Sequence, residues 1–317
     1  MSKLVLIDGN AILHRAYHAL PPLTTKRGEP INAVYGLVSM LLRVIQDHKP
    51  THIALTFDRP EPTFRHEAFK EYQAQRPVMD KELSGQFEKA KETISAMNIP
   101  IFEKAGFEAD DLIGTLAKQA IGLQTTDYSN KKKAVDRSPL AIDSVVIVTV
   151  DRDILQLVNA KVKVFLPVRG LSEGKLFGVE EVKEKMGVLP SQIPDYKALV
   201  GDQSDNYPGI SGIGPKTAEK LLDKYKSFPE IYKHLDEINI STKTKLVEKK
   251  DDGEMSYRLA KIVTDVELEN DIEQTNRWQI DSQQVLDLFY EFGFKTLAKR
   301  VKEVGKQIVS ENQLNLL

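Results

Sequence analysis

Three short hydrophobic runs in the chain each lead into an acidic residue. These runs, with the acid that follows each, are residues 4–7 with Asp8, residues 53–57 with Asp58, and residues 145–150 with Asp151. Runs of this length that are rich in Val and Ile and lack polar alternation are typical of strands buried on both faces. The sequence therefore predicts buried strands that carry acids at their carboxyl ends.

Helical patterns separate these runs. Apolar residues recur at helical spacing over residues 34–47 and again over residues 109–120. Strands that alternate with helices predict an α/β fold with a mostly parallel central sheet flanked by helices. In such a sheet, ligands gather at the carboxyl ends of the strands, where the three acids would lie.

The rest of the chain divides into an insertion, a loop and a helical part. Residues 63–98 are polar at first and then predict a helix with Leu83 and Phe87 on its apolar face, while residues 124–144 have the composition of an exposed loop. Further helices are predicted at residues 179–186, 194–200, 215–225, 229–234, 243–247, 256–263 and 282–304. We expect an α/β core over residues 1–175, a helical subdomain over residues 176–304 and a flexible tail over residues 305–317.

The composition excludes several classes of site. The 317 residues include no cysteine, which excludes disulfides, thiolate zinc sites and cysteine nucleophiles. The longest nearly continuous hydrophobic stretch, residues 145–150, is far shorter than the ~20 residues that cross a bilayer. Charged residues such as Asp8 and Arg15 interrupt the region where a signal peptide would be apolar. We expect a soluble, cytoplasmic protein whose metal ligands are oxygen or imidazole.

Acidic residues are concentrated at predicted strand ends and helix starts. The nine are Asp8, Asp58, Glu108, Asp110, Asp111, Asp151, Asp153, Asp202 and Asp205. Any one of them alone would more often be a helix cap or a turn residue, but several elements deliver them to the same edge. Clustered carboxylates repel one another unless cations lie between them, and Mg²⁺ or Mn²⁺ prefers such ligands. The sequence therefore predicts a site for two divalent ions suited to phosphodiester hydrolysis.

Charge and the remaining polar residues agree with this hypothesis. The formal net charge is −2, so the chain outside the nine acids is basic, which suits a polyanionic substrate. No Ser-His-Asp set competes with the acids. The six histidines are scattered without metal-ligand spacing, and we expect structural or surface roles for them: His14, His18, His48, His52, His66 and His234.

A glycine-punctuated segment follows the last acids. After Asp202 and Asp205, the sequence Gly212-Ile-Gly214-Pro-Lys216-Thr217 opens a predicted helix. Glycines allow close approach of a backbone, and free amides at a helix start can hold a phosphate beside a lysine. A plain turn between two helices is the alternative. Joined to an acid pair, the segment indicates a helix-hairpin-helix type of contact with a duplex backbone.

Taken together, these motifs resemble the 5′-nuclease (flap endonuclease) family. The resemblance is strongest to the 5′→3′ exonuclease domain at the N-terminus of bacterial DNA polymerase I, and it extends from Lys3 to about Val304. The segments that carry it are residues 6–10, 15–22, 33–36, 56–58, 108–111, 151–153 and 201–218. It implies a PIN-like α/β nuclease core with a helix-three-turn-helix DNA-binding subdomain.

The resemblance also implies an activity and a division of the acids. The protein is expected to be a monomeric two-metal 5′→3′ exonuclease and flap endonuclease acting on DNA with 5′ flaps, nicks or RNA primers, in Okazaki fragment processing and repair. Asp8, Asp58, Glu108, Asp110 and Asp111 are expected to hold the catalytic ion. The second ion is expected among Asp151, Asp153, Asp202 and Asp205.

Substrate contacts follow from the same resemblance. Residues 63–98 would form a helical arch that admits a free 5′ end, with Arg76 on the scissile phosphate as a catalytic residue and Tyr72 stacking on a base. The helix-three-turn-helix would bind the duplex, with a K⁺ ion. The expected DNA contacts are Arg15, Tyr72, Arg76, Gly212, Gly214, Lys216 and Thr217.

Two positions depart from the family pattern. The family usually has Lys where this chain has Gln73, and a cation aimed at the scissile phosphate would stabilise transition-state charge. The family usually has Gly where this chain has Val150, whose side chain could crowd the second metal group. All nine acids are present, so we expect an active enzyme.

The last residues resemble a bacterial sliding-clamp-binding peptide. In this pattern, Gln313 starts an extended segment whose apolar side chains enter a groove on the clamp, and the apolar residues here are Leu314, Leu316 and Leu317. The sliding clamp is thus an expected partner. Such a tail favours a stand-alone nuclease, and the N-terminal nuclease domain of a DNA polymerase I is the alternative.

Two further alternatives concern the chemistry itself. Gln73 and Val150 motivate a non-catalytic protein that binds DNA junctions. An acid-cluster phosphohydrolase acting on small phosphate esters is less consistent, because an aspartyl-phosphate enzyme would want an acid at position 10, where Asn10 stands.

Overall fold

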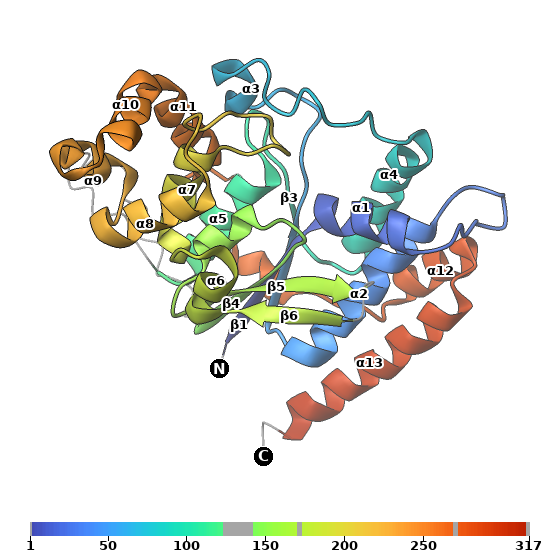
Figure 1. The fold of residues 1–317 in the computed structure, drawn as a ribbon. Coiled ribbons are helices and arrows are strands. Elements are labelled where there is room, and N and C mark those ends of the chain that lie inside the picture. Colours follow the sequence, from blue (N-terminus) through green and yellow to red (C-terminus); the bar gives the residue numbers. More distant parts are fainter. Residues whose placement is uncertain (1, 123–141, 170–172, 269–271, 315–317) are drawn as a thin grey trace.

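A six-stranded sheet forms the centre of the molecule (Figure 1). The computed structural model describes residues 2–122, 142–169, 173–268 and 272–314. In sheet order, the strands are β3 (Ile101–Phe102), β2 (His52–Thr56), β1 (Lys3–Asp8), β4 (Ser144–Val148), β5 (Val162–Arg169) and β6 (Glu173–Phe177). All neighbouring strands are parallel except β6, which is antiparallel to β5. The mostly parallel α/β sheet predicted from the hydrophobic runs is confirmed.

Each face of the sheet is covered by helices, as the uninterrupted apolar runs require. Val5 and Ile7 of β1 belong to a core shared with helices α2 (Asn32–His48) and α4 (Lys81–Ala96). Leu4 and Leu6, which point to the opposite face, pack in a second core with α5 (Ala109–Ala120). The apolar stripe predicted over residues 109–120 therefore lies against the sheet.

The turn from β1 into helix α1 (Gly9–Ala19) is close-packed. The carboxylate of Asp8 caps this helix by accepting a hydrogen bond from the amide of Ala11 at 2.9 Å. A Cβ at Gly9 would lie 2.4 Å from the ring of Phe57, so only glycine fits there. This packing holds the carboxyl end of β1 next to the segment that follows β2.

The chain after β6 forms a helical part that adjoins the α5 side of the sheet (Figure 1). Its helices are α6 (Val179–Met186), α7 (Ile193–Val200), α8 (Pro215–Tyr225), α9 (Phe228–Lys233), α10 (Ile240–Glu248) and α11 (Lys250–Ala260). These agree with the predicted helices, except that α11 covers residues 250–260 where a helix over residues 256–263 was predicted. Beyond Ala260 the backbone is not helical, and the amide of Val263 donates to Asp111 at 2.8 Å.

The C-terminal part differs from its prediction. A single helix was expected over residues 282–304, but Gly293, with φ of 80°, separates α12 (Gln283–Phe292) from α13 (Lys295–Leu314). The tail expected to be flexible from residue 305 is helical as far as Leu314, because α13 continues through it. The predicted loop over residues 124–144 lies largely outside the described residues.

The insertion over residues 63–98 contains two helices of unequal length. Helix α3 (Phe64–Ala68) is a single short turn, and α4 carries the predicted apolar face with Leu83 and Ile94 buried. Residues 69–80 between them are not helical. In the part of the chain that the structure describes, no helix combines the length and apolar character needed to cross a membrane.

Candidate active site

A cleft of about 1090 Å³ opens at the carboxyl edge of the sheet. It lies where β1, β2 and β4 end beside the start of α5 and the non-helical part of the insertion. Seven of the nine predicted acids line it: Asp8, Asp58, Glu108, Asp110, Asp151, Asp153 and Asp205. The central hypothesis, that folding brings these distant acids to one place, is confirmed.

Backbone amides and one hydroxyl orient the acids nearest the strands. Asp8 accepts a hydrogen bond from the Thr149 hydroxyl at 2.7 Å, in addition to the bond from Ala11. Asp58 accepts one from the amide of Ala109 at 2.7 Å, so the start of α5 is tied to the end of β2. These bonds engage both oxygens of Asp8 and one oxygen of Asp58, and they fix the two carboxylates in the lining of the cleft.

Burial makes full ionisation of this group unfavourable. It raises the pKa of Asp8 to about 7, with further contributions from the charges of Asp58 and Asp151. Burial also raises the pKa of Glu108 to about 7, although the Arg65 guanidinium opposes this. The pKa of Asp110 is raised by burial and by the neighbouring carboxylates. Such a group fits divalent cations, because only cations relieve both the repulsion and the lost hydration.

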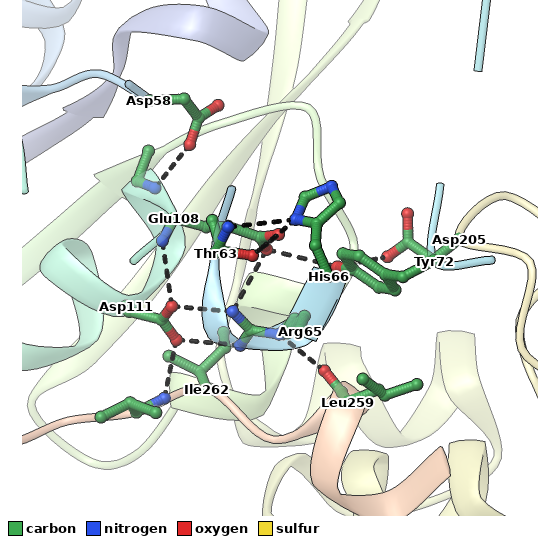
Figure 2. Close-up of polar contacts among 12 residues, drawn as sticks. Asp58, Thr63, Arg65, His66, Tyr72, Glu108, Asp111, Asp205, Leu259 and Ile262 are labelled. Atoms are coloured by element: carbon green, nitrogen blue, oxygen red, sulfur yellow. Dashed lines mark hydrogen bonds and ion pairs between the residues drawn. The ribbon is translucent and has the colours of Figure 1, made fainter. Parts of the chain in front are cut away.

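Asp111 faces away from the cleft, contrary to its predicted role as a ligand of the catalytic ion. Its side chain is fully buried, and Arg65 donates two hydrogen bonds to it at 2.7 and 2.9 Å (Figure 2). The amides of Glu108 and Val263 donate to the same carboxylate at 3.1 and 2.8 Å. Both oxygens are thus occupied within the fold, and Asp111 acts as an anchor.

Arg65 is a residue that the sequence analysis did not single out. It is only 2% exposed, and its Nε donates to the carbonyl oxygen of Leu259 at 2.8 Å. It also lies 3.3 Å from a carboxylate oxygen of Glu108. Arg65 therefore joins the insertion, the start of α5 and the end of α11 behind the cleft.

The second acidic group contains a lysine. One carboxylate oxygen from each of Asp153, Asp202 and Asp205 lies within 4.8 Å of the others, a spacing that suits a metal ion. The ammonium of Lys197, on α7, contacts both Asp153 and Asp202. Burial alone would raise the pKa of Asp202, but Lys197 and nearby hydrogen bonds lower it. Sequence reasoning missed Lys197 because its distance in sequence from Asp153 hides the contact.

The non-helical part of the insertion is hydrogen-bonded to the loop that carries Asp205. Arg76 forms an ion pair with Asp205 at 2.6 Å, and the amide of Gln73 donates to the carbonyl oxygen of Asp205 at 3.0 Å. The Tyr72 hydroxyl lies 3.3 Å from oxygens of both Glu108 and Asp205 (Figure 2). Tyr72 is only 3% exposed, so its ring does not offer the open stacking face that was predicted.

Two further residues of the sequence analysis lie at the cleft. Gln73 and Val150 both line it, so the two departures from the family pattern face the acids. Val150 also packs against the core on the α2 side of the sheet. Arg15 lines the cleft as well, beside His14 and His18 on the same helix.

Three of the six histidines, for which structural or surface roles were expected, lie at the cleft. His14, His18 and His66 all line the cleft. The first two are four residues apart on α1, a spacing that places them on one helix face and that could have indicated their common direction. The Nδ1 atom of His66 lies 2.9 Å from the hydroxyl of Thr63, the residue that caps helix α3 at the start of the insertion (Figure 2).

The glycine-punctuated segment lies outside the cleft, between α7 and α8. A Cβ at Gly209, which has φ of 61°, would lie 2.2 Å from the amide nitrogen of Gly201, so these two glycines carry the tight turn. The backbone of Gly214 has open space around it, and Lys216 is exposed at the start of α8. Lys245 of α10 donates to the carbonyl oxygen of Gly212 at 3.0 Å.

The structure describes only part of the segment proposed for clamp binding. The backbone of Gln313 and Leu314 is helical at the end of α13, which disagrees with an extended peptide for these two positions. Leu316 and Leu317 lie outside the described residues.

Comparison with known families decides the membership. The family described as "5'-3' exonuclease, N-terminal resolvase-like domain" matches residues 3–187, and "5'-3' exonuclease, C-terminal SAM fold" matches residues 188–283. The chain belongs to the 5′-3′ exonuclease family. The resemblance to this family that was inferred from the sequence motifs is confirmed.

Relatives of this family differ in length. A 5'-3' exonuclease from Aquifex aeolicus is 36% identical over 307 residues, which cover 97% of this chain and 98% of that protein. DNA polymerase I from Caldicellulosiruptor bescii is 42% identical over 301 residues, covering 94% of this chain and 33% of the polymerase. The chain thus spans about a third of the length of the polymerases that it matches.

Solved structures share the fold. The flap endonuclease of bacteriophage T5, in a complex with DNA and metal ions, superposes with a TM-score of 0.64 at 20% identity, over 97% of this chain and 99% of that one. The catalytic core of Rad2 in complex with DNA has a TM-score of 0.59 at 14% identity, over 97% of this chain and 92% of that one. At these identities the likeness establishes the α/β fold with its helical C-terminal part.

Proposed function

We propose that this chain is a structure-specific 5′ nuclease that hydrolyses DNA as a 5′→3′ exonuclease and 5′-flap endonuclease. The observation that carries the proposal is the convergence of seven carboxylates on one cleft at the carboxyl edge of the sheet. Membership of the 5′-3′ exonuclease family supports the same activity. Relatives in solved structures bind DNA and metal ions, which supports the substrate and the cofactor.

The donor atoms fit two divalent ions, Mg²⁺ or Mn²⁺. Hard carboxylate oxygens are available in both groups, and burial raises the pKa of Asp8 and of Asp153 to about 7, so that cations are the natural counter-charge. Asp8, Asp58, Glu108 and Asp110 would hold the first ion, and Asp153, Asp202 and Asp205 the second, with Asp151 between the groups. When bound, such ions activate water and stabilise the leaving oxygen.

The protein's own residues position the substrate and balance its charge. The Arg76 side chain is half exposed in the cleft, so its guanidinium can leave Asp205 and contact the scissile phosphate. A fixed donor at this position stabilises the charge that develops during hydrolysis. Arg65, anchored on Asp111, keeps Glu108 in place. Arg15 adds a positive charge at the cleft wall.

The duplex would lie against the helical part. Lys216 and Thr217 stand in the first turn of α8, where Pro215 has no amide hydrogen and the amide of Thr217 donates to the carbonyl oxygen of Gly214 at 3.0 Å. A phosphate at this helix start would therefore be held by the amide and the ammonium of Lys216. Phosphate contacts position a duplex without reading its sequence, so specificity would come from the shape of a 5′ end beside a duplex. The open surroundings of Gly214 allow a close backbone approach, with a K⁺ ion at the helix-three-turn-helix.

The wider biological role follows from this chemistry. Substrates would include 5′ flaps, nicks and RNA primers met during Okazaki fragment processing and repair, with the chain acting as a monomer. A sliding clamp bound by residues 313–317 would bring the nuclease to such sites. Where the same domain forms part of a polymerase, as in several relatives, the nuclease chemistry would be unchanged.

Cleavage of a labelled flap substrate tests the proposal. We expect the full chain to release a short 5′-labelled product in Mg²⁺. Cleavage should stop in EDTA and resume when Mn²⁺ is added. An Asp8→Asn variant should bind the flap but release no product, whereas an Asp47→Asn variant, on the far end of α2, should cleave like the parent. Binding without cleavage by the parent would instead establish a junction-binding protein.

A further inference from the structure

Tyr207 has a buried hydroxyl group that has no hydrogen-bond partner among the residues that the structure describes. The side chain is 3% exposed, and its ring packs with Tyr72 and Leu259. Its backbone is paired with Asp202 through two hydrogen bonds of 2.9 and 3.0 Å. The phenol is therefore held in a fixed position beside the second acidic group. A buried polar atom left unpaired is unfavourable and calls for an explanation.

The surroundings of this hydroxyl are charged. Burial raises the pKa of Tyr207, and its electrostatic neighbours are Lys197, Asp153, Asp202 and Asp205. The same hydroxyl is among the neighbours that act on Lys197. The second acidic group and its lysine are thus close enough to act on the phenol electrostatically, and the backbone pairing with Asp202 places Tyr207 in the same loop as two of these acids.

Lys197 stands where a divalent ion would bind. Its ammonium contacts Asp153 and Asp202, two of the three carboxylates whose spacing suits a metal ion. An ammonium and a divalent cation that share the same carboxylate oxygens repel each other strongly in a buried site. The flexible four-carbon stem of lysine allows the ammonium to move without moving α7.

The displaced ammonium needs an acceptor, since an unpaired buried charge is costly. The nearby groups are mostly engaged: Asp205 forms its ion pair with Arg76, and the Tyr72 hydroxyl lies within hydrogen-bond distance of Glu108 and Asp205. The Tyr207 oxygen has two acceptor lone pairs and no partner.

We propose that Tyr207 is a positioning residue that accepts a hydrogen bond from Lys197 when a divalent ion takes Asp153, Asp202 and Asp205. The Lys197–Tyr207 pair then sets the affinity of the second ion. Lys197 holds the carboxylates together before the ion binds, and the phenol oxygen of Tyr207 accepts a hydrogen bond from the displaced ammonium afterwards. The inference rests on the proposed two-ion site. It assigns to Tyr207 a role that neither the acids nor the substrate contacts fill.

The test measures binding of Mn²⁺ to the full chain without DNA, using electron paramagnetic resonance to count free Mn²⁺. The parent should bind two ions, and an Asp202→Asn variant identifies which of them belongs to the second group. Tyr207→Phe should weaken that ion about tenfold, the value of one hydrogen bond to a charged group, and leave the other unchanged. The matched control is Tyr196→Phe. Tyr196 lies on α7, next to Lys197, but its hydroxyl is near Glu219 of α8.

A double-mutant comparison separates this role from a structural one. In a Lys197→Met background, the Tyr207→Phe change should have no further effect on either ion. Without metal, Tyr207→Phe should unfold at no lower temperature than the parent, because the hydroxyl that it removes has no partner. If Lys197→Met does not fold, the comparison of Tyr207→Phe with Tyr196→Phe still decides.

Each other outcome overturns the inference. An unchanged affinity for the second ion in Tyr207→Phe would exclude the role of the hydroxyl while leaving the two-ion nuclease intact. An equal loss with and without Lys197 would show that the phenol acts on the ion and not on the lysine. If the parent binds no second ion, the inference fails together with the second metal group.

Discussion

Arg65 and Asp111 form a bidentate ion pair at 2.7 and 2.9 Å, in which Arg65 lies at the wall of the acidic cleft and Asp111 is buried behind it (Figure 2). The pair connects the first helix of the insertion to the start of α5, the helix that carries Glu108 and Asp110 at its N-terminal end. Two adjacent acids, Asp110 and Asp111, therefore have different tasks. Asp110 lines the cleft, and Asp111 holds the wall of the cleft in place.

This division predicts opposite effects from one substitution at two neighbouring positions. Asp111→Asn should lower the free energy of unfolding by ~3–5 kcal/mol, because it leaves the Arg65 charge buried without its partner. Asp110→Asn should abolish cleavage without loss of stability in EDTA, because it removes a carboxylate that its neighbours repel. Urea denaturation and flap cleavage of both variants check this. Equal stability of the two variants would contradict the separate tasks.

The raised pKa values predict how metal-free stability depends on pH. Burial raises the pKa of Asp8, Glu108 and Asp153 from the ordinary values of these carboxyl groups, 3.8 for Asp and 4.5 for Glu, to about 7. At pH values between the ordinary carboxyl pKa and the raised pKa of about 7, the folded protein binds more protons than the unfolded chain. These groups therefore make the metal-free protein less stable as pH rises through this window. Mg²⁺ binds the ionised carboxylates, and its stabilising effect should grow over the same window.

Thermal unfolding in Mg²⁺ and in EDTA measures this effect. The difference in Tm between the two conditions should be larger at about pH 8 than at about pH 6. An Asp8→Asn/Asp153→Asn double variant is the control, and its difference should be small at both values. A difference that shrinks as pH rises would show that the carboxylates do not have the raised pKa values.

The sequence was sufficient to predict the sheet and most of the acids, for a physical reason. Buried parallel strands require uninterrupted apolar runs, so the runs before Asp8, Asp58 and Asp151 were recognisable without any tertiary information. Parallel neighbours then necessarily place their carboxyl ends at one edge. Strands β3, β5 and β6 were not predicted: β3 has only two residues, β5 leads into no acid, and β6 is polar, with only Phe177 buried, at the antiparallel edge of the sheet.

The errors concern contacts that cross large distances in the sequence. Asp111 looked like a ligand because it follows Asp110, and only its pairing with Arg65 shows that it faces the other way. Lys197 and Tyr207 lie near Asp202 and Asp205 in the sequence, but no motif singled them out, and the contact of Lys197 with Asp153 spans 44 residues. The helix break at Gly293 was missed because the apolar pattern continues across it.

Gln73 offers a test of the departure from the family pattern. Gln73 lines the cleft, and its backbone amide donates to the backbone carbonyl oxygen of Asp205, so a longer cationic side chain there would reach toward the bound phosphate. Gln73→Lys should cleave a flap at least as fast as the parent in single-turnover conditions. Gln75→Lys adds the same charge nearby but outside the cleft lining, and it should have a smaller effect. A slower Gln73→Lys enzyme would show that the side-chain amide of glutamine is the better group at this position.

Arg76 is expected to act on the substrate and not on the fold. Its side chain is 51% exposed although it pairs with Asp205, and such pairs contribute little to stability. Arg76→Ala should therefore leave the urea midpoint nearly unchanged but slow single-turnover cleavage by ~10²–10³, as expected on losing a donor to the developing charge. Arg43→Ala, which breaks an exposed pair with Asp47 on α2, should change neither. A similar loss of cleavage rate in Arg76→Ala and Arg43→Ala would contradict a specific role of Arg76 in cleavage.

The most direct measurement of the central claim is the location of bound metal in a crystal of the full chain soaked in Mn²⁺. Anomalous scattering identifies the ions independently of any model of the site. We predict two peaks in the cleft, one among Asp8, Asp58, Glu108 and Asp110, and one among Asp153, Asp202 and Asp205. Peaks confined to carboxylates outside the cleft, with these two groups empty, would contradict the account.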